Sequence, residues 1–236
     1  MSNITLYDYW RSSASYRVRI ALHIAGLDFK SISVDLSQGH HKSEEHVRRN
    51  PQAFVPVIDI DGQMLSQSLT IIEYLDDTRN LNLFPKNAMD RAKVNALAHT
   101  IALDIHPICN LSVSSEAEKI SGETNFKKKW IHQFMKPGLE AFEIQLEKLP
   151  KSTYCFNENP TIADICLLPQ IYNAIRWEID ISKFDRINLV IEACEKNPAF
   201  IKAHPDMLKP TPTYTAFGFL RIKSTPFLTA GLSFTI

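Results

Sequence analysis

The sequence predicts an α/β fold over residues 1–85, followed by an all-α fold over residues 90–212. Three observations support this division. Short apolar runs alternate with amphipathic stretches in the first part, strand signals nearly vanish after residue 90, and Pro85 and Asn87 mark a linker between them. A chain of 236 residues is long enough for one large or two small domains.

The first predicted strand covers residues 4–7, and a helix follows it. Apolar residues recur in that helix at the spacing of one helical face, at Val18, Ala21, Leu22 and Ala25. Gly26 comes next, where a left-handed residue commonly ends a helix. Residues 29–36 alternate between apolar and polar side chains and predict the second strand.

The next segment, residues 39–50, is polar and predicts a loop with a short helix. Asp61-Gly62 then separates the apolar runs 56–60 and 63–66, and this dipeptide between two such runs predicts a tight hairpin. Ser68 opens another helix. The predicted order is therefore strand, helix, strand, helix, strand, strand, helix.

The second part is periodic in the helical sense. One long helix is predicted over residues 90–116, with a kink at Pro107, because proline removes a helical hydrogen bond. A second is predicted over residues 126–149, interrupted at Pro137-Gly138.

Three further helices complete the predicted all-α part. Thr161 and Asp164 predict a capping box before the apolar run 165–175. Residues 184–195 and 198–203 predict the last two helices. Residues 213–236 show no clear period, and we treat them as a C-terminal tail of unknown role.

The composition excludes several classes of protein. Twenty-six Lys and Arg residues balance 26 Asp and Glu residues, which gives no reason to expect a nucleic acid or an anionic membrane as partner. No apolar run approaches the roughly 20 residues that span a bilayer. The four cysteines lack the spacing of a metal site, so we expect no metal. Without a signal peptide, the expected location is the cytoplasm.

The most informative segment is the start of the first helix, residues 11–22. Ser12 and Ser13 stand where a helix presents unpaired N–H groups and the positive end of its dipole. Hydroxyl groups there either cap the helix or face an anion. The residues alone leave both interpretations open.

This segment, RSSASYRVRIAL, closely resembles the signature of the zeta class of glutathione transferases. The resemblance continues in order through Asn50-Pro51, Val55-Pro56, Gln67-Ser68 and Ala163-Asp164, and covers about residues 4–212. The class includes maleylacetoacetate and maleylpyruvate isomerases. The resemblance implies a thioredoxin-like N-terminal domain, an all-α C-terminal domain and glutathione as cofactor.

The resemblance assigns the glutathione sulfur to the first helix. Ser12 would offer its hydroxyl, and Ser13 and Ala14 their backbone N–H groups, to a thiolate. A free thiol has a pKa of about 8.5, which helix N-termini lower. Many zeta enzymes carry cysteine where this chain has Ala14, so only chemistry that depends on a protein thiol is in doubt. Capping remains the alternative role for both serines.

The resemblance also assigns the rest of glutathione. Val55-Pro56 matches the cis-proline position, where the Val55 backbone would pair with the cofactor as an added strand does. Gln67 and Ser68 would hold the γ-glutamyl carboxylate, with helix capping as the alternative for Ser68. His41 would reach the glycyl end, although a loop histidine is often merely solvated.

The implied substrate is a small cis-enone dicarboxylate. Arg11 and Arg176 would bind its carboxylates, because arginine suits bidentate capture, and surface salt bridges are their alternative role. The cofactor site would also take residues from the long helix: His106, Asn110, Leu111 and Ser112. For Arg17 and Arg19 we expect packing and ion pairs instead.

The implied function is glutathione-dependent cis–trans isomerisation of maleylacetoacetate to fumarylacetoacetate in tyrosine and phenylalanine catabolism. The thiolate would add to the conjugated double bond, permit rotation and leave again. The alternatives are maleylpyruvate isomerase, a general glutathione transferase or dehalogenase, and a non-catalytic binding protein. The family also implies a homodimer that joins the thioredoxin-like half of one subunit to the helical half of the other.

Overall fold

The computed structural model describes residues 4–209 and contains a four-stranded sheet in the order β2-β1-β3-β4. The strands are β1 (Thr5–Asp8), β2 (Lys30–Ser33), β3 (Val57–Ile60) and β4 (Gln63–Ser66). β1 pairs with β2 in parallel, and the other two pairs are antiparallel. The predicted order of elements and the thioredoxin-like fold class are confirmed. The predicted tail, residues 213–236, and residues 210–212 lie outside the described residues.

The hairpin between β3 and β4 forms as predicted. Ile60 pairs with Gln63 across a two-residue turn, and both turn residues have positive φ, 52° at Asp61 and 76° at Gly62. This is the backbone that a type I′ turn requires. β2 is shorter than the predicted strand over residues 29–36, because its partner β1 ends at Asp8, whose carbonyl accepts a last hydrogen bond from the N–H of Val34.

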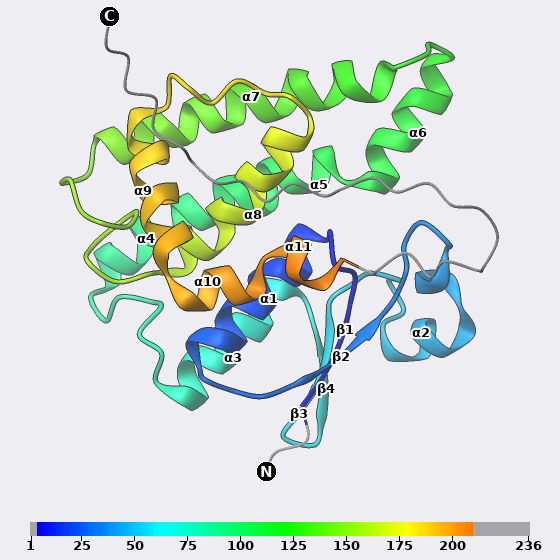
Figure 1. Cartoon of the computed structure of the whole chain (residues 1–236), viewed down its shortest axis with the longest axis horizontal. Helices are drawn as coiled ribbons and strands as arrows, with labels where there is room; N and C mark the ends of the chain where they lie inside the picture. Colours follow the sequence, from blue (N-terminus) through cyan, green and yellow to red (C-terminus); the bar gives the residue numbers. More distant parts are fainter. Residues whose placement is uncertain (1–3, 210–236) are drawn as a thin grey trace, which may run out of the picture.

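Helices α1 (Ser13–Ile24) and α3 (Ser68–Arg79) lie on one side of the sheet, and α2 (Glu44–Arg49) lies on the other (Figure 1). A 3₁₀ turn, His40–Lys42, precedes α2. Gly26 ends α1 with φ of 64°, and the N–H of Leu27 reaches the carbonyl of Leu22. The predicted glycine C-cap is therefore confirmed.

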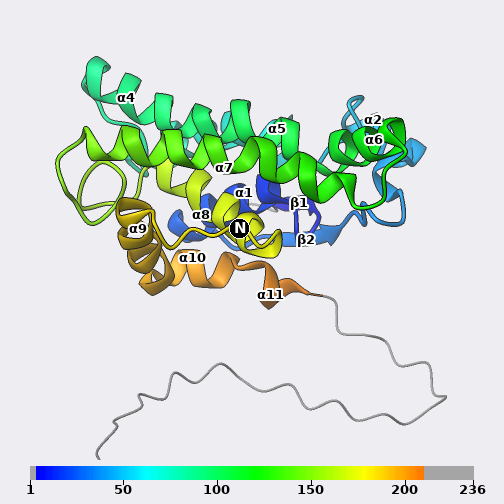
Figure 2. The same ribbon diagram turned by 90° about the horizontal axis from the view of Figure 1, so that it is seen from above.

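The helical part packs against α1 from the side away from the sheet. Figure 2 shows α7 lying along the row formed by α4, α5 and α6. The helices of this part are α4 (Ala88–His99), α5 (His106–Cys109), α6 (Leu111–Ser121), α7 (Phe126–Glu147), α8 (Ile162–Arg176), α9 (Asp185–Lys196), α10 (Pro198–Ala203) and α11 (Pro205–Leu208). The predicted capping box opens α8, where the N–H and Oγ1 of Thr161 each donate to Asp164 at 2.8 Å.

The predicted single helix over residues 90–116 is wrong. A π-helical segment, Thr100–Ile105, separates α4 from α5, and the N–H of His106 bonds to the carbonyl of Ile101. This wider turn lies directly before Pro107, whose ring and missing N–H are incompatible with regular helical bonding. The chain then leaves the helix at Asn110, whose extended backbone begins α6.

The predicted interruption at Pro137-Gly138 is also wrong, since α7 continues through both residues. Apolar side chains on either side of the proline, such as Met135 and Leu139, are buried and hold the helix to one core. A Cβ atom at Gly138 would lie 2.5 Å from Cγ1 of Ile105. The glycine therefore allows α7 to approach the π-helical segment closely.

α1 is the central helix of the molecule. Nine of its twelve residues are buried, and it packs against α3 on one side and against α8 and α10 on the other. Its buried residues include Arg17 and Arg19 as well as apolar side chains. This position brings the first turn of α1 to the junction between the sheet and the helical part.

Candidate active site

The loop from β1 to α1 ends at Ser12, which is the N-cap of α1. Its backbone is extended, and its Oγ accepts a hydrogen bond from the N–H of Ser15 at 3.2 Å. Within residues 4–209, the Ser12 hydroxyl and the N–H groups of Ser13 and Ala14 donate to no acceptor. Capping uses a lone pair of the Ser12 oxygen and leaves its proton free, so Ser12 can cap the helix and face an anion at once.

The Ser13 hydroxyl has a different environment. It is buried, donates to the carbonyl of Pro169 and accepts from Nδ2 of Asn173, both at 3.4 Å. The side chain therefore joins α1 to α8. Only the backbone N–H of Ser13 remains available to a ligand.

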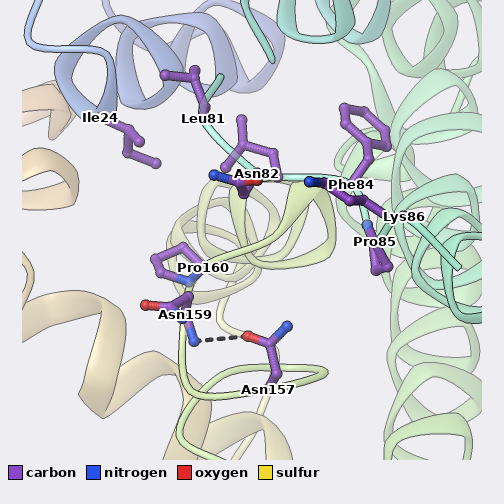
Figure 3. Close-up of a pocket in the computed structure, with 10 residues that line it drawn as sticks. Ile24, Leu81, Asn82, Phe84, Pro85, Lys86, Asn157, Asn159 and Pro160 are labelled. Carbon is purple, nitrogen blue, oxygen red and sulfur yellow. Dashed lines mark hydrogen bonds between the residues drawn. The ribbon is translucent and has the colours of Figure 1, made fainter. Parts of the chain in front are cut away.

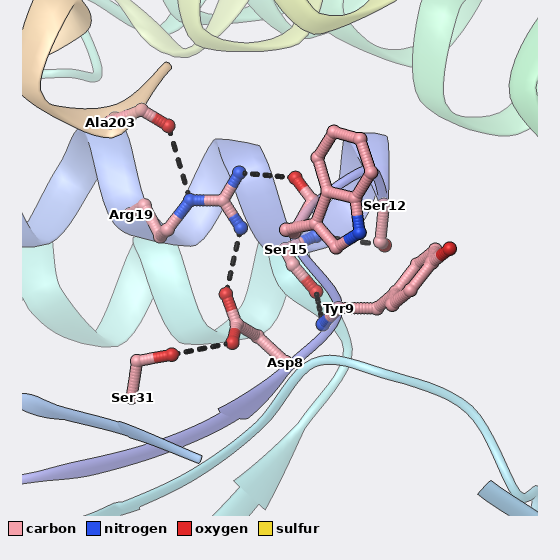
Figure 4. A network of polar contacts seen from close by, with 8 residues as sticks. Asp8, Tyr9, Ser12, Ser15, Arg19, Ser31 and Ala203 are labelled. Carbon is pink, nitrogen blue, oxygen red and sulfur yellow. Dashed lines mark hydrogen bonds and ion pairs between the residues drawn. The ribbon is translucent and has the colours of Figure 1, made fainter. Parts of the chain in front are cut away.

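A buried network fixes the loop that carries these groups (Figure 4). Arg19 Nη1 lies 2.7 Å from Oδ2 of Asp8, and Ser31 donates to the other carboxylate oxygen at 2.7 Å. Arg19 also donates to the carbonyls of Trp10 at 3.0 Å and Ala203 at 3.1 Å. The ion pair predicted for Arg19 is confirmed. Through all of these contacts, Arg19 ties the loop at Trp10 to β1 and α10.

Arg11 and Arg176 approach each other at the edge of this loop. Arg11 donates to the Tyr9 hydroxyl at 2.8 Å, and Arg176 donates to Oδ1 of Asn173 at 2.8 Å. Partial desolvation and the Arg11 guanidinium lower the pKa of Arg176. Among the residues that the structure describes, no carboxylate lies within 4.0 Å of either arginine. The alternative of surface salt bridges is therefore not observed among these residues, and the charge of Arg11 acts on Arg176.

The Val55–Pro56 peptide bond is cis, as expected. Val55 is 8% exposed, and neither its N–H nor its C=O has a hydrogen-bond partner within the described chain. Buried backbone groups are nearly always paired. The unpaired groups of Val55, just before β3, could therefore pair with a peptide-like ligand.

The start of α3 differs in detail from the prediction. Gln67, not Ser68, occupies the N-cap position, with φ of 69° and no capping hydrogen bond from its side chain. Ser68 is the first helical residue, and its Oγ accepts from Arg17 Nη1 at 3.4 Å. Because Ser68 is the first residue inside the helix and not its N-cap, the Ser68 hydroxyl does not cap α3. The N–H groups of the first turn have no partner among residues 4–209.

The histidines of the predicted site are held neutral. Desolvation, together with Lys42 and His46, lowers the pKa of His41, which lies in the 3₁₀ turn. Desolvation and the nearby Arg17 guanidinium lower the pKa of His106 to about 3. Neither imidazole therefore brings a positive charge to the site near neutral pH.

The predicted group Asn110, Leu111 and Ser112 makes local contacts. Oδ1 of Asn110 accepts from the N–H of Val113 at 2.9 Å and from Oγ of Ser112 at 2.8 Å, so Asn110 caps α6. Leu111 and Ser112 are exposed. No hydrogen bond joins this group to α1 in the described part of the chain.

Three residues near the site were not identified from the sequence as parts of it. Asn173 is hydrogen-bonded to both Arg176 and Ser13. The Tyr9 hydroxyl accepts from Arg11, and the Ser68 hydroxyl accepts from Arg17. The position of Asn173, three residues before Arg176 and so on the same helical face, is the one signal that pointed to it. The ion pair expected for Arg17 is absent from residues 4–209.

A cavity of about 570 Å³ lies away from these groups. It is lined by Ile24 at the far end of α1, by the linker from Leu81 to Lys86 and by Asn157, Asn159 and Pro160 (Figure 3). Residues 4–209 hold no cluster of side chains suited to a metal ion and no helix long and apolar enough to cross a membrane.

Comparisons with known proteins give consistent results. Residues 2–77 match the family described as glutathione S-transferase, N-terminal domain. A maleylacetoacetate isomerase of Rhizobium meliloti (strain 1021) is 46% identical over 213 residues, which are 89% of this chain and 100% of that protein. The solved holo structure of a maleyl pyruvate isomerase, a bacterial zeta-class glutathione S-transferase, has a TM-score of 0.83 and 35% identity, covering 85% of this chain and 96% of that one.

A further solved structure was determined with ligands. Maleylacetoacetate isomerase from Anaeromyxobacter dehalogenans 2CP-1, with bound dicarboxyethyl glutathione and citrate in the active site, has a TM-score of 0.79. It is 31% identical and covers 90% of this chain and 96% of that one. The ligands in that protein combine glutathione with carboxylates.

Proposed function

Because this chain belongs to the maleylacetoacetate isomerase family of zeta-class glutathione transferases, we propose that it isomerises maleylacetoacetate to fumarylacetoacetate with glutathione as cofactor. The reaction belongs to tyrosine and phenylalanine catabolism. One observation carries the proposal: the free donors at the start of α1 lie next to two arginines, Arg11 and Arg176, without carboxylate partners.

The residues present fit glutathione. The Ser12 hydroxyl and the N–H groups of Ser13 and Ala14 would hold its sulfur, and the unpaired backbone of Val55 its cysteinyl part. The first turn of α3 would hold the γ-glutamyl carboxylate. The remaining candidates for the cofactor site are Gln67, Ser68, His41 and His106, with Asn110, Leu111 and Ser112 as predicted from the resemblance.

When bound, glutathione supplies a thiolate that serves as a nucleophilic catalyst at the conjugated cis double bond. The Ser12 hydroxyl would donate a hydrogen bond to the sulfur and so favour its negative charge. The N–H groups of Ser13 and Ala14 and the α1 dipole act in the same direction. Ala14 contributes an N–H but no thiol.

Arg11 and Arg176 bind and orient the substrate carboxylates. Desolvation and then the charge of Arg11 lower the pKa of Arg176, and a dianion bound between the two arginines would offset both effects. By binding the carboxylates, the two arginines orient the double bond of the substrate relative to the sulfur before rotation takes place.

The test is the glutathione-dependent loss of the cis-enone absorbance, measured with maleylacetoacetate and with maleylpyruvate. Arg11→Met and Arg176→Met are each expected to raise KM about 10-fold or more, since each removes a charge-assisted contact. Arg91→Met is the matched control, because Arg91 is exposed and, within the described chain, its side chain donates to the carbonyl of Pro85 alone. No glutathione-dependent change with either substrate refutes the isomerase assignment.

Maleylpyruvate isomerase is the second candidate, and the similarity to the solved maleyl pyruvate isomerase favours it. A higher kcat/KM for maleylpyruvate in the same assay would establish it. A non-catalytic binding protein has less support, because such proteins tend to lose the residues of the glutathione site, whereas Ser12, Val55 and Ser68 are present here with polar groups that are free within residues 4–209. Such a protein would leave both substrates unchanged.

We also propose that the protein is a cytoplasmic homodimer. Large apolar side chains are exposed in both parts of the chain, including Phe54 and Met64 in the first and Leu103 and Leu111 in the second. A second copy would cover such surface. The four buried, unpaired cysteines suit a reducing compartment. Light scattering of the full chain measures the mass, and a monomer at micromolar concentration would contradict the dimer.

A further inference from the structure

Arg17 is a buried cation for which the described chain offers no counter-ion. It is 2% exposed, its Nη1 donates to Ser68 Oγ at 3.4 Å, and its Nε and Nη2 have no partner. Arg19, one helical step further, differs: its donors reach Asp8, Trp10 and Ala203. Within residues 4–209 no carboxylate lies within 4.0 Å of Arg17.

The neighbours of Arg17 do not neutralise it. His106 is uncharged near neutral pH, and burial raises the pKa of the Cys166 thiol to about 11, so that group is also neutral. An arginine side chain stays protonated in proteins, and a buried charge without a partner is costly. A ligand that brings a negative charge would remove this cost.

The contact of Arg17 with Ser68 indicates where the negative charge of a ligand would lie, namely at the start of α3. Ser68 is the first residue of α3, a helix of twelve residues whose first N–H groups are unpaired. The Ser68 oxygen accepts from Arg17, which leaves the Ser68 proton free to donate outward. An anion at the start of α3 would therefore meet the N–H groups, the Ser68 hydroxyl and, behind that hydroxyl, the Arg17 charge.

We propose that Arg17 is a positioning residue for the cofactor: its charge acts through Ser68 on the free α-carboxylate of the γ-glutamyl group of glutathione. The proposal rests on the proposed function, since it takes glutathione as the ligand. It deepens that function by stating what the site selects. A glutathione whose γ-glutamyl carboxylate is neutralised loses the partner of Arg17, whereas a change at the glycyl end does not.

The experiment compares three ligands by calorimetry on the full chain: glutathione, its γ-glutamyl α-carboxamide and its glycyl carboxamide. The wild-type protein is expected to bind glutathione about 10-fold or more tightly than the γ-glutamyl carboxamide, as for a charge pair a few ångströms apart in a partly desolvated site. In Arg17→Met this preference falls to about 3-fold or less. Arg17→Lys, which keeps the charge, retains most of it.

The glycyl carboxamide is the internal control. Its preference relative to glutathione is expected to be the same in wild type and Arg17→Met, because Arg17 faces the other end of the cofactor. A purely structural role for Arg17 would weaken all three ligands alike and leave both preferences unchanged. That result overturns the proposal and leaves the proposed function intact. Failure of wild type to bind glutathione at all overturns both.

A second measurement covers the case in which Arg17→Met does not fold. With ¹⁵N-labelled arginine in the wild-type chain, the Arg17 side-chain resonance, assigned from the spectrum of Arg17→Lys, reports on the environment of the guanidinium. Glutathione is expected to shift this resonance and the γ-glutamyl carboxamide to leave it nearly in place. Equal shifts with the two ligands, or no shift with glutathione, overturn the proposal.

Discussion

Replacement of Ser12 by alanine removes two interactions of one hydroxyl group, the cap of α1 and the proposed contact with the glutathione sulfur, and each loss has its own measurable effect. The Ser12 hydroxyl accepts the N–H of Ser15 and so caps α1, while its own proton is free to donate to a thiolate. In Ser12→Ala both interactions are lost, but the N–H groups of Ser13 and Ala14 remain. We therefore expect a limited loss of stability and a larger loss of thiol acidity.

The two magnitudes follow from the structure. An N-cap replaced by alanine costs about 1 kcal/mol of the free energy of unfolding. A hydrogen bond to a charged group contributes about 1.5–3 kcal/mol, which corresponds to a rise of about 1–2 units in the pKa of the bound glutathione thiol. The ratio of thiolate to thiol at a given pH then falls about 10- to 100-fold, and kcat falls by the same factor at pH values below the thiol pKa.

Ultraviolet titration of bound glutathione measures the thiol pKa, and urea unfolding measures the stability. Ser13→Ala is the matched control, because its hydroxyl contacts Pro169 and Asn173 on α8. That variant is expected to lose about 1–3 kcal/mol of stability with the thiol pKa nearly unchanged. An unchanged thiol pKa in Ser12→Ala, or an equal rise in both variants, would refute the assignment of Ser12.

Three further outcomes test the fold around the site. Asp8→Ala leaves Arg19 buried without its carboxylate and is expected to cost about 3–5 kcal/mol in urea unfolding; a loss below 1 kcal/mol would contradict a tight buried pair. Gly138→Ala places a Cβ 2.5 Å from Cγ1 of Ile105 and is expected to cost about 1–3 kcal/mol, seen as a lower Tm. The pKa of His106 falls from 6.5 when unfolded to about 3 when folded, so between these pH values the unfolded chain binds more protons and stability decreases as pH falls. His106→Gln lacks this component, and between pH 7 and pH 4 the wild type is expected to lose at least about 1 kcal/mol more than the variant in urea unfolding; parallel losses would show that His106 titrates normally.

The elements that the sequence predicted well are specified by neighbouring residues. The Asp61-Gly62 turn, the Gly26 C-cap and the Thr161–Asp164 capping box each form through contacts within a few positions along the chain. The two errors in the helical part have tertiary causes. Whether Pro107 bends a helix and whether Pro137 ends one depends on the close packing of α7 against the π-helical segment, which local periodicity does not contain.

The residues of the site also fall into those that the sequence predicted and those that depend on contacts between distant parts of the chain. The motif and its resemblance located the free donors at Ser12, and the cis bond before Pro56 was expected from its position. The role of Asn173 depends on a contact with Ser13 across 160 positions. The missing counter-ion of Arg17 is a property of everything packed around α1, so no spacing along the chain predicts it.

The burial of α1 on every side has a consequence for the autonomy of the first 85 residues. Although they contain the whole sheet, Arg19 in α1 needs the carbonyl of Ala203, and the Ser13 hydroxyl needs α8. A fragment cut at the linker would expose this face of its central helix to water and leave the Nε of Arg19 and the Ser13 hydroxyl without these partners. We therefore expect the two halves to unfold in one transition, so that glutathione binding is no detachable module that evolution or an engineer can graft elsewhere.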